Sequence, residues 1–168
     1  MTLTFAEMTH SNYPLACRID RSDVSEDFVD TAETLMELTD YAVRHRCLGH
    51  TFLIQSDSVP IGLLLLGEAI PWETDPEPMH HAPFYRLMGF VLDKAYRNQG
   101  LGGKILEEAI SRVYADFGRR SIALGCHREN IMAAHFYERH GFVRTGVFEG
   151  EDEYFLRLLP PAAAQSPQ

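Results

Sequence analysis

The alternation of apolar and polar residues predicts strands in the first half of the chain. "LTFAEM" alternates and predicts a strand over Thr2–Met8. "HTFLIQ" and "PIGLLLLGEA" flank an Asp57-Ser58 turn and predict an antiparallel hairpin. Two helices are expected before this hairpin, a short one over about Pro14–Ile19 and a longer one over about Ser25–Arg46. Ser25 is the expected cap of the longer helix.

The second half predicts strands and helices that alternate. "FYRLMGFVLD" predicts the most apolar strand, Phe84–Leu92, and "SIALGC" predicts a buried strand over Ser121–Cys126. A helix of about Gly100–Phe117 joins these two strands, so they should run parallel. A further helix of about Ile131–His140 should end at Gly141 in a C′ position. "FVRTGVFEG" and "EDEYFLRLL" then predict a closing hairpin.

Two segments lack any such periodicity. Ile70–Pro83 holds four prolines and predicts a loop between strands, long enough to carry function. "PPAAAQSPQ" at the end predicts disorder. We therefore expect one domain over residues 1–160, followed by a disordered tail over residues 161–168.

The net charge of −9 is unevenly distributed. Residues 1–82 carry 4 Lys and Arg against 14 Asp and Glu, a net charge of −10, whereas residues 83–168 carry a net charge of +1. The acidity can belong to solvated helix faces, or it can concentrate cationic small molecules. No basic stripe is present to neutralise phosphates, which disfavours a nucleic-acid partner.

The remaining composition predicts a cytoplasmic protein without a metal. No run of about 18 apolar residues predicts a membrane-spanning helix, and the first residues do not resemble a signal peptide. Three widely spaced cysteines favour reduced thiols over a disulfide framework or a zinc site. The adjacent His80 and His81 are better explained as loop surface than as metal ligands.

A glycine-rich turn, "YRNQGLGGKILEEAI", lies between a predicted strand and a predicted helix. Gly100, Gly102 and Gly103 would let backbone N–H groups approach a phosphate at the start of that helix. The alternative is a tight turn with close packing of the strand on the helix. A P-loop is excluded because no Ser or Thr follows Lys104, and the glycine spacing does not match G-x-G-x-x-G either.

The spacing Arg97-x-x-Gly100-x-Gly102 resembles the coenzyme A pyrophosphate loop of the GCN5-related N-acetyltransferases. A second stretch, "ENIMAAHFYERHGF", resembles the second motif of that family. The matching positions there are Asn130, Ala133, Tyr137, Gly141 and Phe142. Together with the order of predicted elements, the resemblance covers about residues 2–159.

This resemblance implies an acyl-CoA N-acyltransferase fold of the α/β (α+β) class. Such a fold has a mixed, mostly antiparallel central sheet of about six to seven strands with a V-shaped splay, and helices on both faces. It also implies acetyl-CoA as the acetyl donor, with no metal, and a pantetheine arm that enters the splay beside Phe84–Leu92. The implied coenzyme A contacts are the backbone of Phe90, Val91 and Leu92, the turn residues Arg97, Asn98, Gln99, Gly100, Leu101, Gly102, Gly103 and Lys104, and Asn130, Ala133 and Tyr137.

The same resemblance assigns chemistry to Tyr137, whose phenol would donate a proton to the departing sulfur. Ala133, one turn earlier, is small and leaves room for that sulfur. No residue is forced as the base that deprotonates the amine. Glu68, at the end of the strand beside the splay, is the first candidate, with Glu129 and a chain of water molecules as alternatives.

A finer resemblance concerns the acceptor. "RIDRSDVSEDFVDTAETLMEL" and "VLDKAYRNQGLG" look like bacterial spermine/spermidine acetyltransferases of the diamine type. The chain departs from such enzymes in having Gly89 where they often carry an Arg, and it has Met88 where the animal diamine acetyltransferases place a Glu. The implied substrate-binding residues are Glu26, Asp27 and Phe28, with Trp72 and Tyr85 as cation–π partners.

These features predict an N-acetyltransferase that acts on a primary amine of a small cationic substrate, with a polyamine such as spermidine or spermine as the first hypothesis. An aminoglycoside, an amino acid or a protein N-terminus are alternatives within the enzyme class. A non-catalytic acyl-CoA-binding module is an alternative outside it. The expected partners are a small-molecule amine, no nucleic acid and no membrane, and the closing hairpin is compatible with a homodimer.

Overall fold

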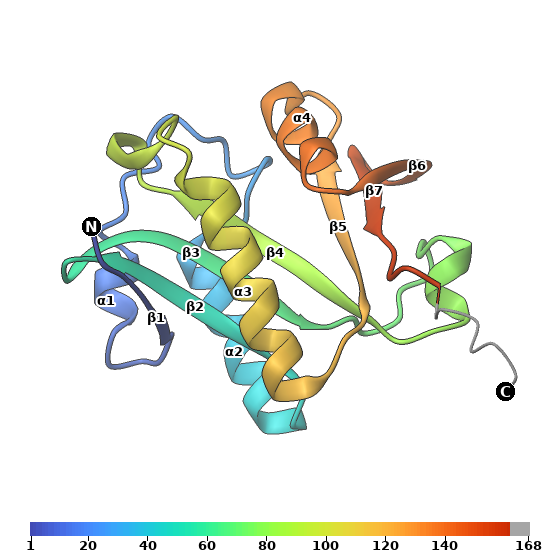
Figure 1. The fold of residues 1–168 in the computed structure, drawn as a ribbon, viewed down its shortest axis with the longest axis horizontal. Helices are drawn as coiled ribbons and strands as arrows, with labels where there is room; N and C mark the ends of the chain where they lie inside the picture. Colours follow the sequence, from blue (N-terminus) through green and yellow to red (C-terminus); the bar gives the residue numbers. More distant parts are fainter. Residues whose placement is uncertain (162–168) are drawn as a thin grey trace, which may run out of the picture.

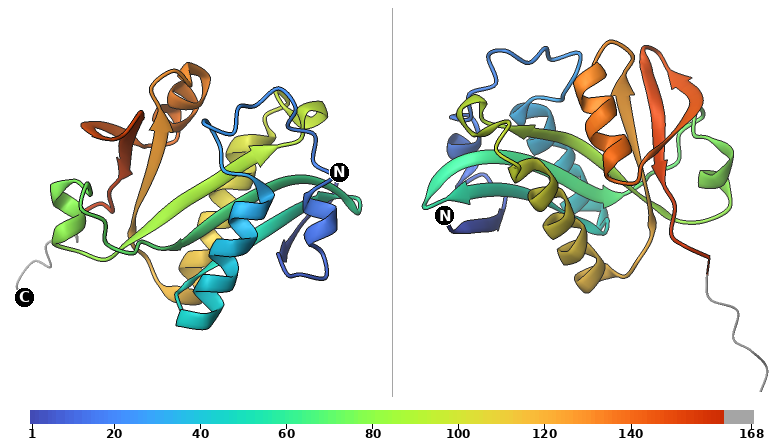
Figure 2. Two further views of the ribbon diagram at one scale, coloured as in Figure 1. Left: turned by 180° about the vertical axis from the view of Figure 1, so that it is seen from behind. Right: turned by 45° about the horizontal axis from the view of Figure 1, so that its top comes forward.

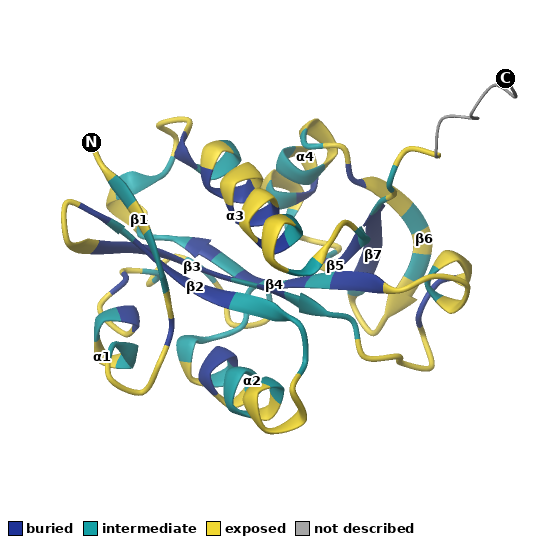
Figure 3. Cartoon of the chain, turned by 60° about the horizontal axis from the view of Figure 1, so that its bottom comes forward, coloured by how far each residue is buried: buried dark blue, intermediate teal, exposed yellow. Residues whose placement is uncertain are grey.

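The computed structural model describes residues 1–161, in which seven strands form one sheet with helices on both faces (Figures 1 and 3). The strand order is β1-β2-β3-β4-β5-β7-β6, and only the β4–β5 pair is parallel. The predicted fold class is therefore confirmed. In chain order the elements are β1 (Leu3–Glu7), α1 (Tyr13–Ala16), α2 (Ala32–His45), β2 (Gly49–Ser56), β3 (Val59–Glu68), β4 (Phe84–Leu92), α3 (Leu101–Phe117), β5 (Ser121–His127), α4 (Ile131–Arg139), β6 (Val143–Glu149) and β7 (Asp152–Arg157).

Most predicted elements are present at or near their predicted bounds. The β4 strand has the predicted ends, and the loop after β3 contains only a short 3₁₀ turn, Glu77–His80. In the β2–β3 turn, both Asp57 and Ser58 adopt positive φ, as a two-residue type I′ hairpin turn requires. The predicted disordered tail lies outside the described residues, except for Pro161.

The start predicted for the longer helix is wrong. The α2 helix begins at Ala32, and Thr31 is its N-cap, with Oγ1 accepting a hydrogen bond from the N–H of Thr34 at 3.2 Å. Ser25 instead accepts from the N–H of Asp27 within a turn. Residues 17–31 therefore form a loop between α1 and α2, which we call the α1–α2 loop. This difference brings acidic residues of the loop to the site described below.

Two hydrophobic layers lie on opposite faces of the sheet (Figure 3). On one face, α3 packs its apolar stripe against side chains of β2 and β3 such as Phe52 and Leu64. On the other face, Leu35 and Met36 of α2 pack on Leu53 and Leu63. The apolar run of β3 follows from this arrangement, since a strand covered on both faces needs apolar residues at successive positions.

The β4 and β5 strands separate along their length (Figures 1 and 2). They pair only at Phe84–Arg86 with Ser121–Ala123, although β4 continues to Leu92 and β5 to His127. The pairing of β3 with β4 is also irregular between Leu63 and Leu65. The predicted V-shaped splay is thus present, with its open end toward α4 and the start of α3.

Gly89 lies at the irregularity in β4 and has a positive φ of 63°. A Cβ there would lie 2.6 Å from the Leu35 side chain of α2. A side chain at this position would require Leu35 to move, in addition to the strain of the positive φ.

We expect Gly89→Ala to lower the free energy of unfolding by about 3 kcal/mol, because left-handed strain and overpacking each cost about 1–3 kcal/mol. Gly146→Ala is the matched control. Gly146 has a similar φ of 72°, but no atom lies within 4 Å of a Cβ placed on it, so we expect a loss of about 1 kcal/mol there. Urea unfolding of both variants measures the difference, and equal losses would show that Leu35 simply moves aside.

Candidate active site

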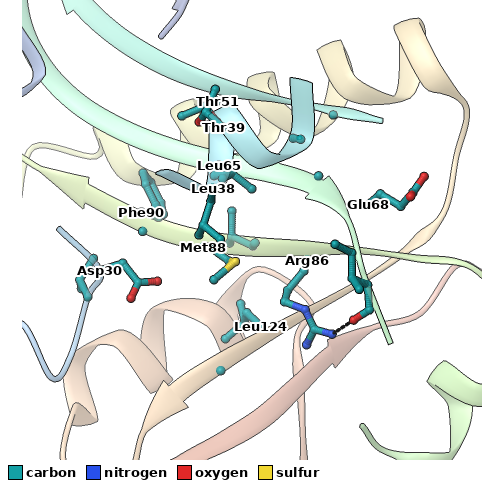
Figure 4. A pocket seen from close by; sticks show the side chains of 18 of the residues that line it. Asp30, Leu38, Thr39, Thr51, Leu65, Glu68, Arg86, Met88, Phe90 and Leu124 are labelled. Carbon is teal, nitrogen blue, oxygen red and sulfur yellow. Dashed lines mark hydrogen bonds between the residues drawn. The ribbon is translucent and has the colours of Figure 1, made fainter. Parts of the chain in front are cut away.

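A cavity of about 1060 Å³ extends from the β4–β5 splay toward the α1–α2 loop and the loop that follows β3 (Figure 4). Its wall comprises residues of these loops together with residues of α2, β2, β3, β4, β5, α4 and the β6–β7 turn. Segments far apart in the sequence therefore meet around one space large enough for a small molecule.

The open side of β4 can receive an extended chain. From Leu87 to Leu92 the strand has no β5 partner, so its backbone polar groups on that side can pair with amides, except for the carbonyl of Leu92, which accepts from Nε of Arg97. Phe90 lines the cavity, whereas Val91 packs into the core beside α2. The predicted contacts of Phe90, Val91 and Leu92 would therefore be made by backbone groups, and this edge fits the amides of a pantetheine arm.

The N-terminus of α3 is suited to an anion. Gly100 is its N-cap in the left-handed conformation, with φ of 74°, and no side chain caps the helix. The backbone N–H groups of residues 97–100 donate to no other described residue. Space beside Gly100 is open, since no atom lies within 4 Å of a Cβ placed there. Unpaired N–H groups and the helix dipole fit the pyrophosphate of coenzyme A.

The other two glycines of the turn have a packing role. A Cβ on Gly102 would lie 3.1 Å from the ring of Phe136, and one on Gly103 would lie 2.5 Å from Nε2 of His140. Both rings belong to the α4 region, which packs tightly against the first turn of α3. Close helix packing therefore gives Gly102 and Gly103 a structural role, and the predicted coenzyme A contacts of their backbone N–H groups stay predictions.

The guanidinium of Arg97 is bound to protein groups. Its Nε donates to the carbonyl of Leu92 at 2.9 Å and its Nη1 to Asp23 at 2.6 Å. The guanidinium thus ties the α1–α2 loop to the turn before α3, while its Nη2 has no hydrogen-bond partner among the described residues, so the coenzyme A contact of Arg97 stays a prediction. The backbone of Asp20 strengthens this tie, accepting from the N–H of Lys94 at 2.8 Å. Lys104 remains exposed beside the turn.

The α4 helix places three predicted residues on the cavity wall: Asn130, Ala133 and Tyr137. Asn130 is the N-cap, with Oδ1 accepting from the N–H of Ala133 at 3.3 Å. The ring of Tyr137 is held edge-on against Phe136 and Phe142, at centroid distances of 5.3 and 5.6 Å. Its phenol makes no hydrogen bond to another described residue and can donate into the cavity.

Burial raises the pKa of Tyr137 well above that of a free phenol, and the nearby Cys126 raises it further. The phenol is therefore protonated at neutral pH and can act as a donor. Burial, followed by the charge of Asp152, raises the pKa of Cys126 to about 11, so this cysteine is a neutral thiol. Cys126 thus lies within electrostatic reach of both Asp152 and Tyr137 beside the splay.

The cavity wall is acidic, and four of its seven carboxylates, on Glu7, Asp30, Glu149 and Asp152, were not expected from the sequence. Burial raises the pKa of Asp30, opposed by Arg21, and burial also raises the pKa of Asp152, with a further contribution from Asp30. The side chain of Asp30 points into the cavity near Phe90 (Figure 4). The acidic residues of the lining are Glu7, Glu26, Asp27, Asp30, Glu68, Glu149 and Asp152, against the arginines Arg46 and Arg86.

Four of the five predicted substrate residues line this cavity: Glu26, Asp27, Phe28 and Trp72. Phe28 reaches from the α1–α2 loop to the ring of His127 on β5, at a centroid distance of 4.9 Å. Tyr85 is the exception, and its prediction is corrected. Tyr85 is 0% exposed in the core, and its hydroxyl donates to the carbonyl of Gly118 at 2.6 Å, because its side chain points to the α3 face of the sheet.

The two carboxylates considered as bases differ in position. Glu68 lines the cavity but lies beyond Arg86, away from Asp30 (Figure 4). Glu129 is exposed on the β5–α4 turn and is not part of the lining.

Among residues 1–161, no group of three or more His, Cys, Asp or Glu side chains could hold a metal ion. Within the same residues, no helix has the length and apolar character needed to cross a membrane.

A splayed sheet, a free strand edge and an uncapped helix N-terminus together define a coenzyme A-binding acyltransferase fold. The model of the acetyltransferase (GNAT) family matches residues 14–142. The chain therefore belongs to the acetyltransferase (GNAT) family.

Individual relatives agree with this assignment. The chain is 31% identical over 77 residues to YwnH of Bacillus subtilis (strain 168), provisionally named as a phosphinothricin acetyltransferase. The match spans 43% of this chain and 47% of YwnH, about half the length of that curated relative.

Among solved structures, aminoglycoside acetyltransferase AAC(6')-Ib in complex with coenzyme A superimposes with a TM-score of 0.69, at 17% identity, over 94% of this chain and 95% of that one. A chimera of the spermidine N-acetyltransferase SpeG from Vibrio cholerae and hSSAT superimposes with a TM-score of 0.61, at 17% identity, over 94% of this chain and 96% of that one.

The family predicted from the two motifs is thus confirmed, and so is acetyl-coenzyme A as its acetyl donor. The comparisons do not single out the spermidine enzymes, because solved structures named for different amines have the same fold.

Proposed function

We propose that the protein is an N-acetyltransferase that moves an acetyl group from acetyl-coenzyme A to the primary amine of a small cationic molecule. The observation that carries the proposal is the single cavity that joins the free edge of β4, the phenol of Tyr137 and an acidic wall. The aminoglycoside and the spermidine named for two solved structures of the same fold support a cationic acceptor.

Acetyl-coenzyme A supplies the acetyl group as a thioester. The free β4 edge and the N-terminus of α3 would bind its pantetheine and pyrophosphate and orient the thioester beside Tyr137. As the amine nitrogen bonds to the acetyl carbon and the carbon–sulfur bond breaks, the phenol of Tyr137 donates a proton to the sulfur. Both substrates must be bound together, because the transfer is direct.

The attacking amine must also lose a proton. Glu68 is the acceptor suggested by the sequence, but Asp30 is better placed, because it lies near Phe90 on the splay side of the cavity (Figure 4). Its raised pKa also makes Asp30 a stronger proton acceptor than an ordinary aspartate. We propose Asp30 for this role.

Within this function, polyamines such as spermidine or spermine are the finer hypothesis. The resemblance in the α1–α2 loop supports them, and the seven carboxylates of the lining would attract a polycation. An aminoglycoside, an amino acid, a protein N-terminus and a non-catalytic acyl-CoA-binding module are the alternatives. The homodimer also stays a prediction.

We expect thiol release from acetyl-coenzyme A when the protein is mixed with a suitable primary amine. Spermidine, spermine, an aminoglycoside and a short peptide form the first panel, with thermal unfolding in the presence of acetyl-coenzyme A as a separate measure of donor binding. Protection against heat without release on any amine would favour the acyl-CoA-binding module. No protection and no release would contradict the proposed function altogether.

A further inference from the structure

Two apolar side chains lie exposed on the rim of the cavity, in the loop that follows β3. Ile70 is 39% exposed and Trp72 is 50% exposed. Both line the cavity. Side chains of this kind are more often buried, and exposed apolar residues that are grouped at a pocket commonly mark a binding surface. Their exposure is therefore a feature of the cavity and not of the core.

A buried carboxylate fixes the backbone that carries these two side chains. The side chain of Asp75 is 4% exposed and accepts hydrogen bonds from the N–H of Trp72 at 2.9 Å and from the hydroxyl of Tyr154 at 3.1 Å. Nη2 of Arg86 donates to the same carboxylate at 3.2 Å and to the carbonyl of Ile70 at 3.0 Å. The polar groups of the loop are thus bound to the protein, while Ile70 and Trp72 stay exposed at the cavity.

The cavity wall between these side chains and Asp30 is also apolar. Met88 lies between Asp30 and Arg86 (Figure 4). The neighbouring residues that line the cavity are Leu38, Leu65 and Leu124 (Figure 4). An acceptor whose amine is placed at Asp30 and whose body extends toward Trp72 would therefore lie along apolar side chains.

The charge at the far end of this wall disfavours a second ammonium group. The guanidinium carbon of Arg86 lies 5.7 Å from the centre of the Trp72 ring. An ammonium group placed on that ring would be close to a like charge, which weakens binding. The carboxylate of Glu68 lies beyond Arg86 and points away from Met88 (Figure 4). An alkyl or aryl group meets no such repulsion, and it would remove the exposed surface of Ile70 and Trp72 from water.

We propose that the acceptor is a primary amine with an apolar alkyl or aryl body, and that Trp72 and Ile70 bind the end of that body farthest from the amine. The inference rests on the proposed acetyl transfer, and it narrows the acceptor to molecules with one charged end. It competes with the polyamine hypothesis, because a polyamine carries a further cation where this part of the cavity is apolar.

The wild-type protein is tested with pairs of amines of equal size, in which one member ends in a methyl group and the other in a second ammonium group. The pairs are hexylamine with 1,5-diaminopentane, and 4-ethylbenzylamine with 1,4-bis(aminomethyl)benzene. Each is assayed by thiol release from acetyl-coenzyme A, with spermidine alongside. We expect kcat/KM per primary amine to be about 10-fold or more higher for the methyl-ended member of at least one pair, and higher than for spermidine.

Trp72→Ala tests the surface itself, because it removes the indole ring but keeps the backbone N–H that donates to Asp75. We expect KM for the preferred methyl-ended amine to rise about 10-fold with little change in kcat, and KM for its diamine partner to stay within about twofold. Trp72→Phe keeps an apolar ring and should retain most of the wild-type preference. Val59→Ala is the control and should change neither value, since Val59 is 47% exposed at the start of β3 and does not line the cavity.

The outcomes separate this inference from the proposed function. Ratios below about 10-fold in both pairs, or a preference for spermidine, would overturn the inference and leave the acetyl transfer intact. An equal effect of Trp72→Ala on both members of a pair would also overturn it, and Trp72 would then serve only to shape the loop. If Trp72→Ala does not fold, the wild-type pairs decide alone. Failure of every amine to release thiol would refute the proposed function, and the inference with it.

Discussion

Replacing Tyr137 with Phe is expected to lower kcat about 100-fold, with KM for acetyl-coenzyme A changed less than about threefold. The ring would keep its edge-on packing on Phe136 and Phe142, so the wall of the cavity would be preserved. Only the hydroxyl would be lost, and a positioned proton donor contributes about 10²–10⁴-fold to a rate. Because burial raises its pKa, the phenol keeps its proton through the neutral range, and the wild-type rate should not fall there through its ionisation.

The control for this substitution is Tyr114→Phe. Tyr114 donates to the carbonyl of Arg120 at 2.5 Å and does not line the cavity. We expect that variant to lose about 1 kcal/mol of stability and no activity. Steady-state kinetics and thermal unfolding of both variants make the comparison. If Tyr137→Phe retained the full kcat, the sulfur would take its proton from elsewhere, such as solvent.

Local sequence patterns predicted the bounds of β4 but not the start of α2. β4 is flanked by a proline-rich loop and a glycine turn, so both of its ends are marked. The start of α2 was misplaced because Ser25 is a good cap residue and Phe28 continues an apolar stripe. The true signal is Thr31 before Ala32, with the Thr34 N–H three residues on. Two cap candidates six residues apart cannot be ranked without knowing what packs on the sheet.

The site was predictable where the family motif fixes a backbone shape, and less so where distant segments meet. Tyr137, Asn130 and Phe90 all line the cavity, as the motifs implied. Asp152 comes from the closing hairpin and Asp30 from a segment expected to be helical, so nothing local joined them. If the start of α2 had been predicted at Ala32, Asp30 would have been assigned to the loop before the helix. A residue in such a loop can face a cavity, so Asp30 would then have been a candidate.

The roles given to individual residues were hardest to predict. Arg97 has the motif position for a phosphate ligand, but Asp23 lies close enough in space to bind its guanidinium. Tyr85 has the right chemistry for a cation, but strand alternation turns it toward α3. For Arg97 the partner is far away in sequence, and no spacing rule contains it. For Tyr85 the alternation is local, but which face of the strand meets α3 depends on the whole sheet.

Asp30→Asn is expected to lower kcat/KM for the amine about 100-fold near neutral pH and to change its pH dependence. In the wild type, kcat/KM should rise with pH as Asp30 ionises, since only the carboxylate accepts a proton from the amine. Burial raises the pKa of Asp30, and Arg21 opposes the shift. The rise should therefore occur above the usual range of an aspartate. The charge of Asp30 also raises the pKa of Asp152, so these two carboxyls do not ionise independently and the rise should be broader than for one isolated group.

Asparagine cannot ionise, so this rise should disappear in Asp30→Asn, while the deprotonation of the free amine affects both proteins alike. Glu68→Gln is the matched control, since it removes the other carboxylate proposed as acceptor from the same cavity. It should keep both the rise and most of the activity. Profiles of kcat/KM against pH for the three proteins decide between the two carboxylates. If Glu68→Gln lost the rise and Asp30→Asn kept it, the proton would go to Glu68. Asp30 would then serve only to attract the amine.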